Sequence, residues 1–247
     1  MLAEYDSIAR QYRRSKDLPF RVYSEVPDHL QLLGKLSELS VLDVACGEGF
    51  YTRLIRQAGA ARAVGVDVSS GMIELARQQE AQSPLGIEYI CHSVEGMPQL
   101  KPFDIVSTAF LLNTAPNAAA LVAMAASLAA NLKPGGRLVA TLGDLGSHPG
   151  VNYRPYGMAT DFAAPLAEGA PYSITFLLGD DTFTITDFAW SRSTIENALS
   201  SAGFVSIRWR PPTITADGLA RFGSEFWQTY LEYPPVIRVE GRLGRTR

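Results

Sequence analysis

The chain has 247 residues, of which 47% are hydrophobic and 19% charged, a balance typical of a globular domain and unlike that of a disordered chain. Its formal charge of -3 argues against a protein built mainly to bind nucleic acid, because such binding depends on clustered Lys and Arg. The arginines at 238, 242, 245 and 247 are expected to belong to a frayed terminal tail.

Cysteine, histidine and hydropathy patterns exclude further classes. Cys46 and Cys91 lie far apart in apolar, strand-like segments, so no disulfide framework is expected. The three histidines and two cysteines show no zinc-like spacing, so we expect no metal. No stretch of about 18 apolar residues and no secretory signal pattern is present, which predicts a cytoplasmic protein without a membrane partner.

From residue 39 to residue 143 the hydrophobic period alternates between that of strands and that of helices, which predicts βαβ units around a parallel sheet, with two further helices upstream. The predicted strands cover residues 40–45, 63–67, 87–91, 103–109 and 137–142. The predicted helices cover residues 2–14, 22–36, 50–57, 71–79 and 118–132. Lys133-Pro134-Gly135-Gly136 is expected to end the last of these helices in a turn.

Downstream of residue 143 the composition changes. Residues 144–171 are rich in Gly, Pro and aromatic residues and are too long for an ordinary connection, which indicates a functional lid. Residues 172–178 and 182–190 predict a β-hairpin. A helix over 193–201, capped by Ser193 with Glu196 at the reciprocal position, a strand over 204–210 and a helix over 217–232 are expected to follow.

The strand that begins at Val41 leads into a glycine turn and then a helix, an arrangement that lets backbone N–H groups approach a ligand. Gly47 and Gly49 form a G-x-G turn, which dinucleotide-binding folds share. Here Thr52 replaces the third glycine, and the carboxylate of Asp43 would repel a pyrophosphate but suit a ligand with a positive amino group and sulfonium. The combination favours S-adenosylmethionine (SAM) over a nicotinamide cofactor, with an oxidoreductase and a non-enzymatic binding protein as alternatives.

The segment Val41-Leu42-Asp43-Val44-Ala45-Cys46-Gly47-Glu48-Gly49 resembles the first motif of class I SAM-dependent methyltransferases, V-L-D-x-x-C-G-x-G. Residues 92–98 are similar to the D-A-E-x-L-P stretch of the family, with Ser93 at the aspartate position, and residues 132–136 to its L-K-P-G-G. The resemblance implies an α/β, Rossmann-like fold with a seven-stranded, mostly parallel sheet and helices on both faces. It also implies an N-terminal helical lid, a β-hairpin cap, SAM as cofactor and S-adenosylhomocysteine (SAH) as product.

The family implies roles for residues of the motifs. Asp67 would accept both ribose hydroxyls of the cofactor, and Met72 would contact the adenine. Residues 5–12 resemble the Y-D-x-x-A-x-x-Y helix that closes over the cofactor in relatives, and the spacing of Arg21 is similar to that of an arginine that holds the cofactor carboxylate. An exposed arginine at a helix start is the alternative for Arg21. The implied cofactor residues are Tyr12, Arg21, Asp43, Ala45, Gly47, Gly49, Asp67, Val68, Met72, Ser93, Val94, Ala109 and Phe110.

Over its whole length the chain resembles the toxoflavin N-methyltransferases, which implies methyl transfer to ring nitrogens of a demethylated azapteridine. An O- or C-methyltransferase acting on a quinone-like or other small metabolite is the alternative. Aromatic side chains of the lid and hairpin could stack on a flat substrate or fill the core. The substrate candidates are Asn113, His148, Tyr153, Phe176 and Trp190. An acidic ring N–H needs no dedicated base; otherwise Asp144 and His148 are the candidates.

These expectations divide a single domain into four parts. Residues 1–38 form the helical lid, residues 39–143 the cofactor-binding core, residues 144–192 the substrate cap and hairpin, and residues 193–247 the C-terminal helix, strand and tail.

Overall fold

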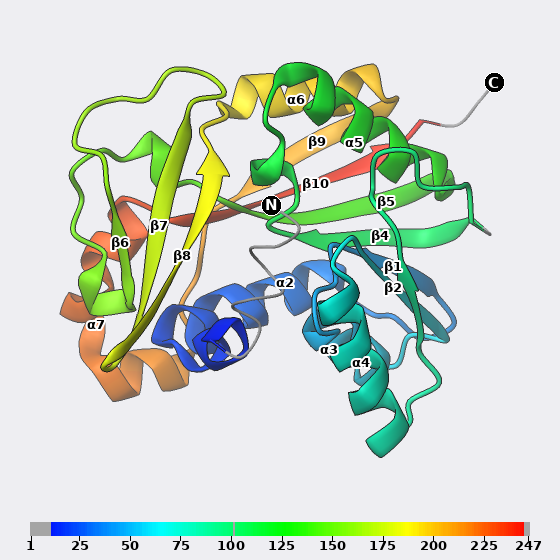
Figure 1. The fold of residues 1–247 in the computed structure, drawn as a ribbon, viewed down its shortest axis with the longest axis horizontal. Coiled ribbons are helices and arrows are strands. Elements are labelled where there is room, and N and C mark those ends of the chain that lie inside the picture. The colour runs from blue at the N-terminus through cyan, green and yellow to red at the C-terminus, as the bar shows by residue number, and fades with distance from the viewer. Residues whose placement is uncertain (1–10, 101, 245–247) are drawn as a thin grey trace.

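The computed structural model describes residues 11–100 and 102–244. The predicted helix over 2–14 lies mostly outside these residues, with Tyr5 and Ala9 of its motif, while residues 11–14 are helical. A central sheet is covered on both faces by helices, and a smaller sheet lies beside it (Figure 1).

The central sheet has seven strands in the order β3-β2-β1-β4-β5-β10-β9. Its strands are β1 (Ser40–Val44), β2 (Arg62–Asp67), β3 (Glu88–Cys91), β4 (Phe103–Ala109), β5 (Leu132–Gly143), β9 (Phe204–Arg210) and β10 (Val236–Leu243). β10 runs antiparallel to both neighbours, and the pairs among β1 to β5 are parallel. Val41, Leu42 and Val44 of β1 are buried, as a strand covered on both faces requires. The predicted mostly parallel, seven-stranded α/β fold is confirmed.

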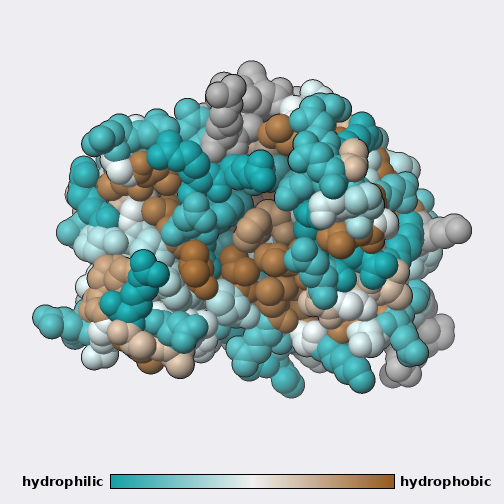
Figure 2. All heavy atoms as spheres, turned by 90° about the horizontal axis from the view of Figure 1, so that it is seen from below, coloured by the Kyte–Doolittle hydropathy of each residue, from teal (hydrophilic) through white to brown (hydrophobic). Residues whose placement is uncertain are grey.

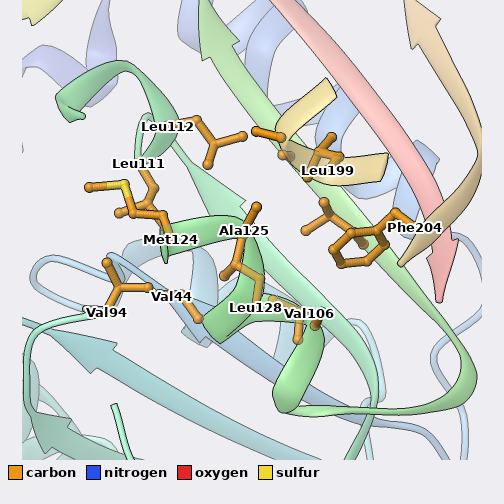
Figure 3. Close-up of a cluster of buried hydrophobic side chains, with 14 of the residues drawn as sticks. Val44, Val94, Val106, Leu111, Leu112, Met124, Ala125, Leu128, Leu199 and Phe204 are labelled. Atoms are coloured by element: carbon orange, nitrogen blue, oxygen red, sulfur yellow. The ribbon is translucent and has the colours of Figure 1, made fainter. Parts of the chain in front are cut away.

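Two layers of helices sandwich the sheet. α2 (Val26–Leu33), α3 (Phe50–Gln57) and α4 (Ser70–Gln82) cover one face, and α5 (Ala118–Ala130) and α6 (Arg192–Ser201) the other. On the α5 side, Leu128 and Leu199 join Val106 of β4 in one apolar cluster (Figure 3). The surface that carries α2, α3 and α7 has hydrophobic side chains near its middle and hydrophilic ones around them (Figure 2).

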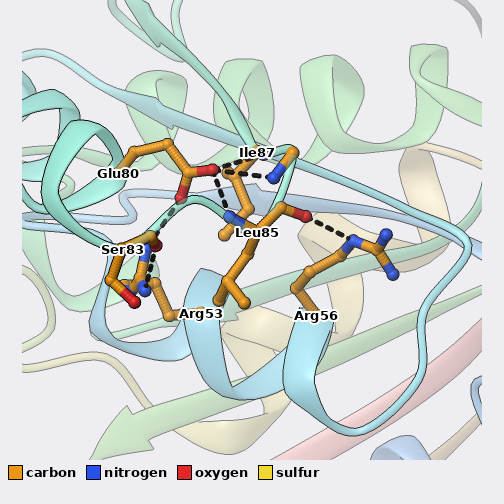
Figure 4. Close-up of polar contacts among 7 residues, drawn as sticks. Arg53, Arg56, Glu80, Ser83, Leu85 and Ile87 are labelled. Atoms are coloured by element: carbon orange, nitrogen blue, oxygen red, sulfur yellow. Dashed lines mark hydrogen bonds and ion pairs between the residues drawn. The ribbon is translucent and has the colours of Figure 1, made fainter.

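The helix boundaries follow from local chemistry. Ser69 caps α4 by accepting a hydrogen bond from the Met72 N–H, and Asn117 caps α5 in the same way. At the far end of α4, Glu80 accepts from the backbone N–H groups of residues 85–87 and from Arg53 Nη1 at 2.7 Å, which fixes the loop that leads into β3 (Figure 4). These contacts tie α3 to the loop between α4 and β3.

The cap is a three-stranded antiparallel sheet with its own apolar cluster. It consists of β6 (Met158–Thr160), β7 (Pro171–Leu178) and β8 (Asp181–Phe188), so the predicted hairpin is present. The predicted lid segment contains η4 (Leu145–Ser147), η5 (Arg154–Tyr156) and β6. Cap aromatics pack against α7 (Ala216–Glu232), where the Tyr156 ring stacks on Trp227 at 5.8 Å. The cap is therefore anchored by a second hydrophobic core.

Three short elements complete the described chain: η1 (Ser15–Asp17), the π-helix η2 (Arg21–Glu25) and η3 (Leu112–Thr114). The predicted helix over 22–36 is shorter, because Gly34 with φ of 71° ends α2 after Leu33. The predicted cap at Ser193 is wrong: Ser191 accepts from the Thr194 N–H and α6 begins at Arg192. Glu196 instead accepts a hydrogen bond from Trp209 Nε1.

Two further predictions are corrected at strands. Lys133–Gly136 does not form a separate turn, because β5 begins at Leu132 and absorbs these residues where its register with β4 shifts. Nor is the C-terminal segment a frayed tail through Leu243: Val236–Leu243 is the strand β10 between β5 and β9. Arg238 there is 1% exposed and pairs with Asp28 at 2.6 Å, so its charge is buried rather than solvated. No helix in the described ranges is long and apolar enough to cross a membrane.

Candidate active site

A cavity of about 400 Å³ lies at the carboxyl ends of β1, β2 and β4, the edge at which ligands bind in open α/β sheets. We call it the sheet-edge cavity. It is lined by the predicted cofactor residues Tyr12, Ala45, Gly47, Asp67, Val68, Met72, Ser93, Val94, Ala109 and Phe110. It is also lined by Val44, Val66, His92, Glu95, Leu111, Thr114 and Met124. Val44, Val94, Leu111 and Met124 come from separate segments and meet on its apolar side (Figure 3).

Asp67 braces the glycine turn. Its Oδ2 accepts a hydrogen bond from the Gly47 N–H at 2.8 Å, and its Oδ1 accepts from the Ser69 N–H at 2.9 Å. Gly49, which caps α3, has φ of 84°, and a Cβ there would lie 2.3 Å from Tyr89 Oη. Only glycine tolerates both this backbone angle and the close approach of Tyr89. Gly49 therefore shapes the turn, although it does not line the cavity.

The backbone is strained at two positions on the cavity wall. Ala45, directly after β1, has φ of 61°, and Phe110, directly after β4, has φ of 62°. Non-glycine residues in this left-handed region cost about 1–3 kcal/mol each and cluster at functional sites. The two strained residues stand on neighbouring strands, since β1 pairs with β4. Sequence patterns carry no signal of this strain.

Asp43 lies beneath the turn rather than on the cavity wall. Its side chain is 1% exposed, and Thr52 Oγ1 donates to Asp43 Oδ2 at 2.6 Å. Burial raises the pKa of Asp43 to about 7, while hydrogen bonds from Thr52 and Ser107 oppose the rise. Next to it, His29 is bonded to Ser107 Oγ at 2.9 Å and to Thr141 Oγ1 at 2.8 Å. These buried polar groups tie β1, β4 and β5 together under the site.

Arg21 forms a buried ion pair with Glu25. Its Nη1 donates to both carboxylate oxygens of Glu25 at 2.9 Å, and Tyr51 Oη donates to the same carboxylate at 2.6 Å. Arg21 does not line the sheet-edge cavity, and its 1% exposure excludes the exposed helix-start arginine.

Two basic side chains lie near the glycine turn: Arg13 Nε is 3.6 Å from Glu48 Oε2, and Lys16 Nζ is 4.4 Å from the Tyr12 ring centroid and 5.0 Å from that of Phe50. Burial lowers the pKa of Lys16 to about 7, and neither side chain lines the sheet-edge cavity. Sequence reasoning missed Lys16.

A second, narrow cavity of about 20 Å³ lies between the cap and the ends of β5 and β10; we call it the cap cavity. Its walls are Tyr12, Phe20, Arg21, Phe110, Gly143, Leu145, Met158, Ile174, Phe176, Ile185, Asp187, Pro235 and Val236. Tyr12 and Phe110 line both cavities and therefore separate them. The Arg21 guanidinium lies 5.2 Å from the ring centroids of Phe20 and Phe110 and 5.6 Å from that of Phe176.

Asp187 was not predicted, although the sequence holds a signal for it. Along β8 the buried positions alternate as Phe183, Ile185 and Asp187, which places a carboxylate where the strand period predicts an apolar side chain. Asp187 is 2% exposed. A buried carboxylate is costly unless its surroundings stabilise it, so an inward aspartate on a cap strand marks a candidate site.

Of the predicted substrate residues, the structure brings only Phe176 to the cap cavity. Asn113 exchanges two hydrogen bonds with the Gly143 backbone, at 2.8 and 3.0 Å. Tyr153 Oη donates to the Tyr233 carbonyl at 3.0 Å, and Trp190 Nε1 donates to the Ala115 carbonyl at 3.0 Å. In all three residues the polar side-chain atoms bond to the backbone of another segment of the protein.

The predicted base candidates lie in other surroundings. Asp144 accepts from Arg192 Nη2 at 2.9 Å and from Ser147 Oγ at 2.5 Å, and with Asn113 and Trp190 it lines a separate cavity of about 240 Å³. His148 Nε2 lies 3.9 Å from Asp144 Oδ2, and burial lowers the pKa of His148. Among the residues that the structure describes, no group of three or more His, Cys, Asp or Glu side chains could hold a metal ion.

Comparisons with known proteins agree with this geometry. Residues 41–136 match the family model described as methyltransferase domain. A ubiquinone biosynthesis O-methyltransferase of Xylella fastidiosa is 29% identical over 158 residues, and the match covers 56% of this chain and 63% of that protein. The chain thus spans less than two thirds of the length of this curated relative.

Solved structures extend the likeness over nearly the whole chain. A SAM-dependent methyltransferase from Mesorhizobium loti superposes with a TM-score of 0.65 at 18% identity, covering 92% of this chain and 99% of that one. A DhpI–SAH complex superposes with a TM-score of 0.62 at 18% identity, covering 99% and 96%. At such identities the likeness shows the fold alone. The chain has the fold of the class I SAM-dependent methyltransferases, and its residues 41–136 match the methyltransferase domain.

Proposed function

We propose that the protein is a SAM-dependent N-methyltransferase acting on ring nitrogens of a small heteroaromatic of the demethylated toxoflavin type. The observation that carries the proposal is the pair of cavities that meet at Tyr12 and Phe110. One has the residues expected for SAM, and the other combines aromatic walls with two buried charged side chains. In this proposal residues 39–143 hold the cofactor and residues 144–192 cover the acceptor.

The residues of the sheet-edge cavity fit SAM. The Asp67 carboxylate faces the cavity beside Gly47, where it suits the ribose hydroxyls, and Ser93 and Val94 lie where they can meet the adenine. Met72 and Val94 supply apolar surface for the ring. Because Arg21 Nη1 is held by Glu25, we assign the cofactor carboxylate to Lys16, whose Nζ lies 4.4 Å from the ring centroid of the cavity residue Tyr12. Burial lowers the pKa of Lys16 to about 7, and a bound carboxylate would favour its charged form. Bound SAM supplies a methyl group on a cationic sulfur, which a ring nitrogen can displace.

At about 20 Å³ the cap cavity has room for a single polar group, so in this proposal only the edge of a flat acceptor enters it, and the ring lies toward Tyr12 and Phe110. Phe20, Phe110 and Phe176 offer ring faces, while the buried Arg21 and Asp187 offer a hydrogen-bond donor and an acceptor. Most of the wall residues are apolar, and the protein would hold the nitrogen in line with the methyl group at about 3–3.5 Å. Arg21 and Asp187 can exchange hydrogen bonds with a polar acceptor but not with a hydrocarbon ring, which favours the polar acceptor.

The decisive experiment incubates the purified protein with SAM and didemethylated toxoflavin and determines the products by mass spectrometry. We expect a gain of one or two methyl groups on nitrogen, located by NMR. Binding of SAH without any mass gain would retain a SAM-binding protein but contradict this acceptor.

O-methylation of a phenolic or quinol-type metabolite is the second candidate, because the curated relatives of Xylella fastidiosa are named as O-methyltransferases. A catechol tested in parallel separates the two. Transfer to the catechol oxygen, with none to didemethylated toxoflavin, would favour the second candidate.

A further inference from the structure

A buried carboxylate, that of Asp187, lines the cap cavity together with Tyr12 and Phe110. Asp187 lies on β8, opposite Tyr172 of β7, and is 2% exposed. A Cβ at Gly143 would lie only 3.3 Å from Asp187 Oδ2, so the glycine at the end of β5 leaves room for this carboxylate. The group is therefore built into the junction of the cap and the central sheet.

Tyr12 connects Asp187 to the cofactor side electrostatically. Burial raises the pKa of Tyr12 to about 12, Arg21 opposes the rise, and the carboxylates of Glu25, Asp67 and Asp187 add to it. The pKa of Tyr12 is therefore influenced both by Asp67, which lines the sheet-edge cavity, and by Asp187, which lines the cap cavity.

Arg21 supplies the complementary group. Its Nη1 is occupied by Glu25, but its buried Nε has no hydrogen-bond partner among the described residues. An unpartnered buried N–H is costly, and a ligand carbonyl oxygen would satisfy it. The cap cavity therefore presents a donor and an acceptor together, the pattern that recognises a carbonyl next to a ring N–H, as in a cyclic amide or imide.

We propose that Asp187 is the catalytic base of the reaction and that Arg21 orients the acceptor through a carbonyl oxygen. The assignment rests on the proposed methyltransferase function. The ring nitrogen forms a bond to the methyl carbon, the carbon–sulfur bond breaks with its electrons left on sulfur, and the N–H proton passes to the Asp187 carboxylate. Charge and atoms balance, since the cation on sulfur is lost and one proton is gained by the enzyme.

Asp187 takes over the role for which Asp144 and His148 were candidates. Asp144 is held by Arg192 and Ser147 in a cavity that shares neither Tyr12 nor Phe110. His148 does not line the cap cavity. Asp187 is the carboxylate among the described walls of the cap cavity.

The test compares the full-length wild type with Asp187→Asn, with Asp187→Glu as the conservative variant and Asp180→Asn as control. Asp180 is exposed on the turn of the same hairpin. Turnover of didemethylated toxoflavin is measured between pH 5 and 10, and the binding of SAH, and of didemethylated toxoflavin in the presence of SAH, by calorimetry. General-base catalysis contributes about 10²–10⁴-fold, so Asp187→Asn should lose about that factor at pH 7.

The pH profile separates a base from a structural residue. Wild-type turnover should level off above the pKa of the base, whereas turnover of Asp187→Asn should rise about tenfold per pH unit as the ring N–H ionises in solution. Asp187→Glu should restore part of the plateau, and Asp180→Asn should match the wild type. SAH affinity should stay within threefold in all variants.

Three results would overturn the role of Asp187. An Asp187→Asn variant that binds SAH and keeps the wild-type profile shows that the carboxylate takes no proton. Loss of activity that Asp187→Glu does not restore, together with lost SAH binding, shows a structural role. A wild type that binds SAH but methylates no ring nitrogen contradicts the proposed function itself, and with it the need for this base.

Discussion

Individual residues fix the shape of the glycine turn. Gly49→Ala adds a Cβ against Tyr89 at a backbone angle that L-residues avoid, whereas Gly59→Ala meets nothing within 4 Å and carries only the backbone strain. We expect Gly49→Ala to cost about 2 kcal/mol or more in unfolding free energy and at least tenfold in SAH affinity. Gly59→Ala should leave SAH affinity unchanged. Denaturant unfolding and calorimetry of both variants check this, and equal losses would show that Tyr89 moves away freely.

His29 makes stability depend on pH. Burial lowers the pKa of His29 to about 3, with Arg238 adding to the shift, so the folded protein keeps this ring neutral. In the unfolded chain the ring takes up a proton below about pH 6.5. The stability due to the depressed pKa is therefore present above pH 6.5 and is lost as the pH falls toward 3.

His29→Gln removes this titration while keeping groups that can bond Ser107 and Thr141. The stability difference between wild type and variant should be constant above pH 7 and shrink on acidification, by a few kcal/mol by pH 3. Urea unfolding at a series of pH values measures it. A difference that does not change with pH would mean that His29 is not neutral and buried in solution.

At this scale, the methyltransferase motifs indicated several residues that line the sheet-edge cavity, and their contacts with a cofactor stay predictions. Gly47, Asp67, Met72 and Ser93 line the sheet-edge cavity as the methyltransferase motifs imply. Sequence analysis proposed Arg21 for the cofactor carboxylate and did not consider Lys16. The position of Arg21 depends on the π-helical turn at Arg21–Glu25 and on the ion pair with Glu25, which no sequence pattern indicates. Asp187 was visible only as an exception in the alternation of β8.

At the scale of elements, β10 shows how an ion pair secures a strand that looked like a tail. Arg238 is paired with Asp28 of α2 in the interior, while Arg242 of the same strand is exposed. Removing one partner of a buried pair leaves an uncompensated charge, so Arg238→Ala should lose about 3–5 kcal/mol of unfolding free energy. Arg242→Ala should change it by less than about 0.5 kcal/mol. Equal effects in denaturant unfolding would contradict the burial of this pair.

The predicted elements were most accurate where hydrophobic period and caps agree. The helix at Phe50–Gln57 and the strands at Phe103–Ala109 and Phe204–Arg210 have the predicted bounds. β10 was not predicted, because its arginines were assigned to a solvent-exposed terminal tail. In the structure Arg238 instead pairs with Asp28 in the interior. The start of β5 was not predicted, because Pro134 and two glycines are typical of a turn. The strand continues through them because residues on either side of them, Leu132 and Arg137, pair with β4.

For the whole molecule, the βαβ pattern predicted a parallel sheet, and the resemblance to class I methyltransferases implied its seven strands; the structure confirms both and adds the strand order. The cap could be predicted as a hairpin, but not its packing on α7, because contacts such as Tyr156 on Trp227 join segments far apart in the sequence. The cap cavity lies beside this packing, and Asp187 and Phe110 both line it. The acceptor therefore has to be inferred from tertiary structure.

The central claim is that the sheet-edge cavity holds SAM with Asp67 on the ribose. Isothermal titration of the wild type and Asp67→Ala with SAH tests it most directly, with NADH as the competing ligand class. We predict that the wild type binds SAH one-to-one and does not bind NADH. Asp67→Ala should bind SAH at least tenfold more weakly, because it removes the hydrogen bonds between the carboxylate and the ribose hydroxyls, which are worth more than about 1.4 kcal/mol. Absence of SAH binding, or an affinity that Asp67→Ala leaves unchanged, would contradict the placement of the cofactor.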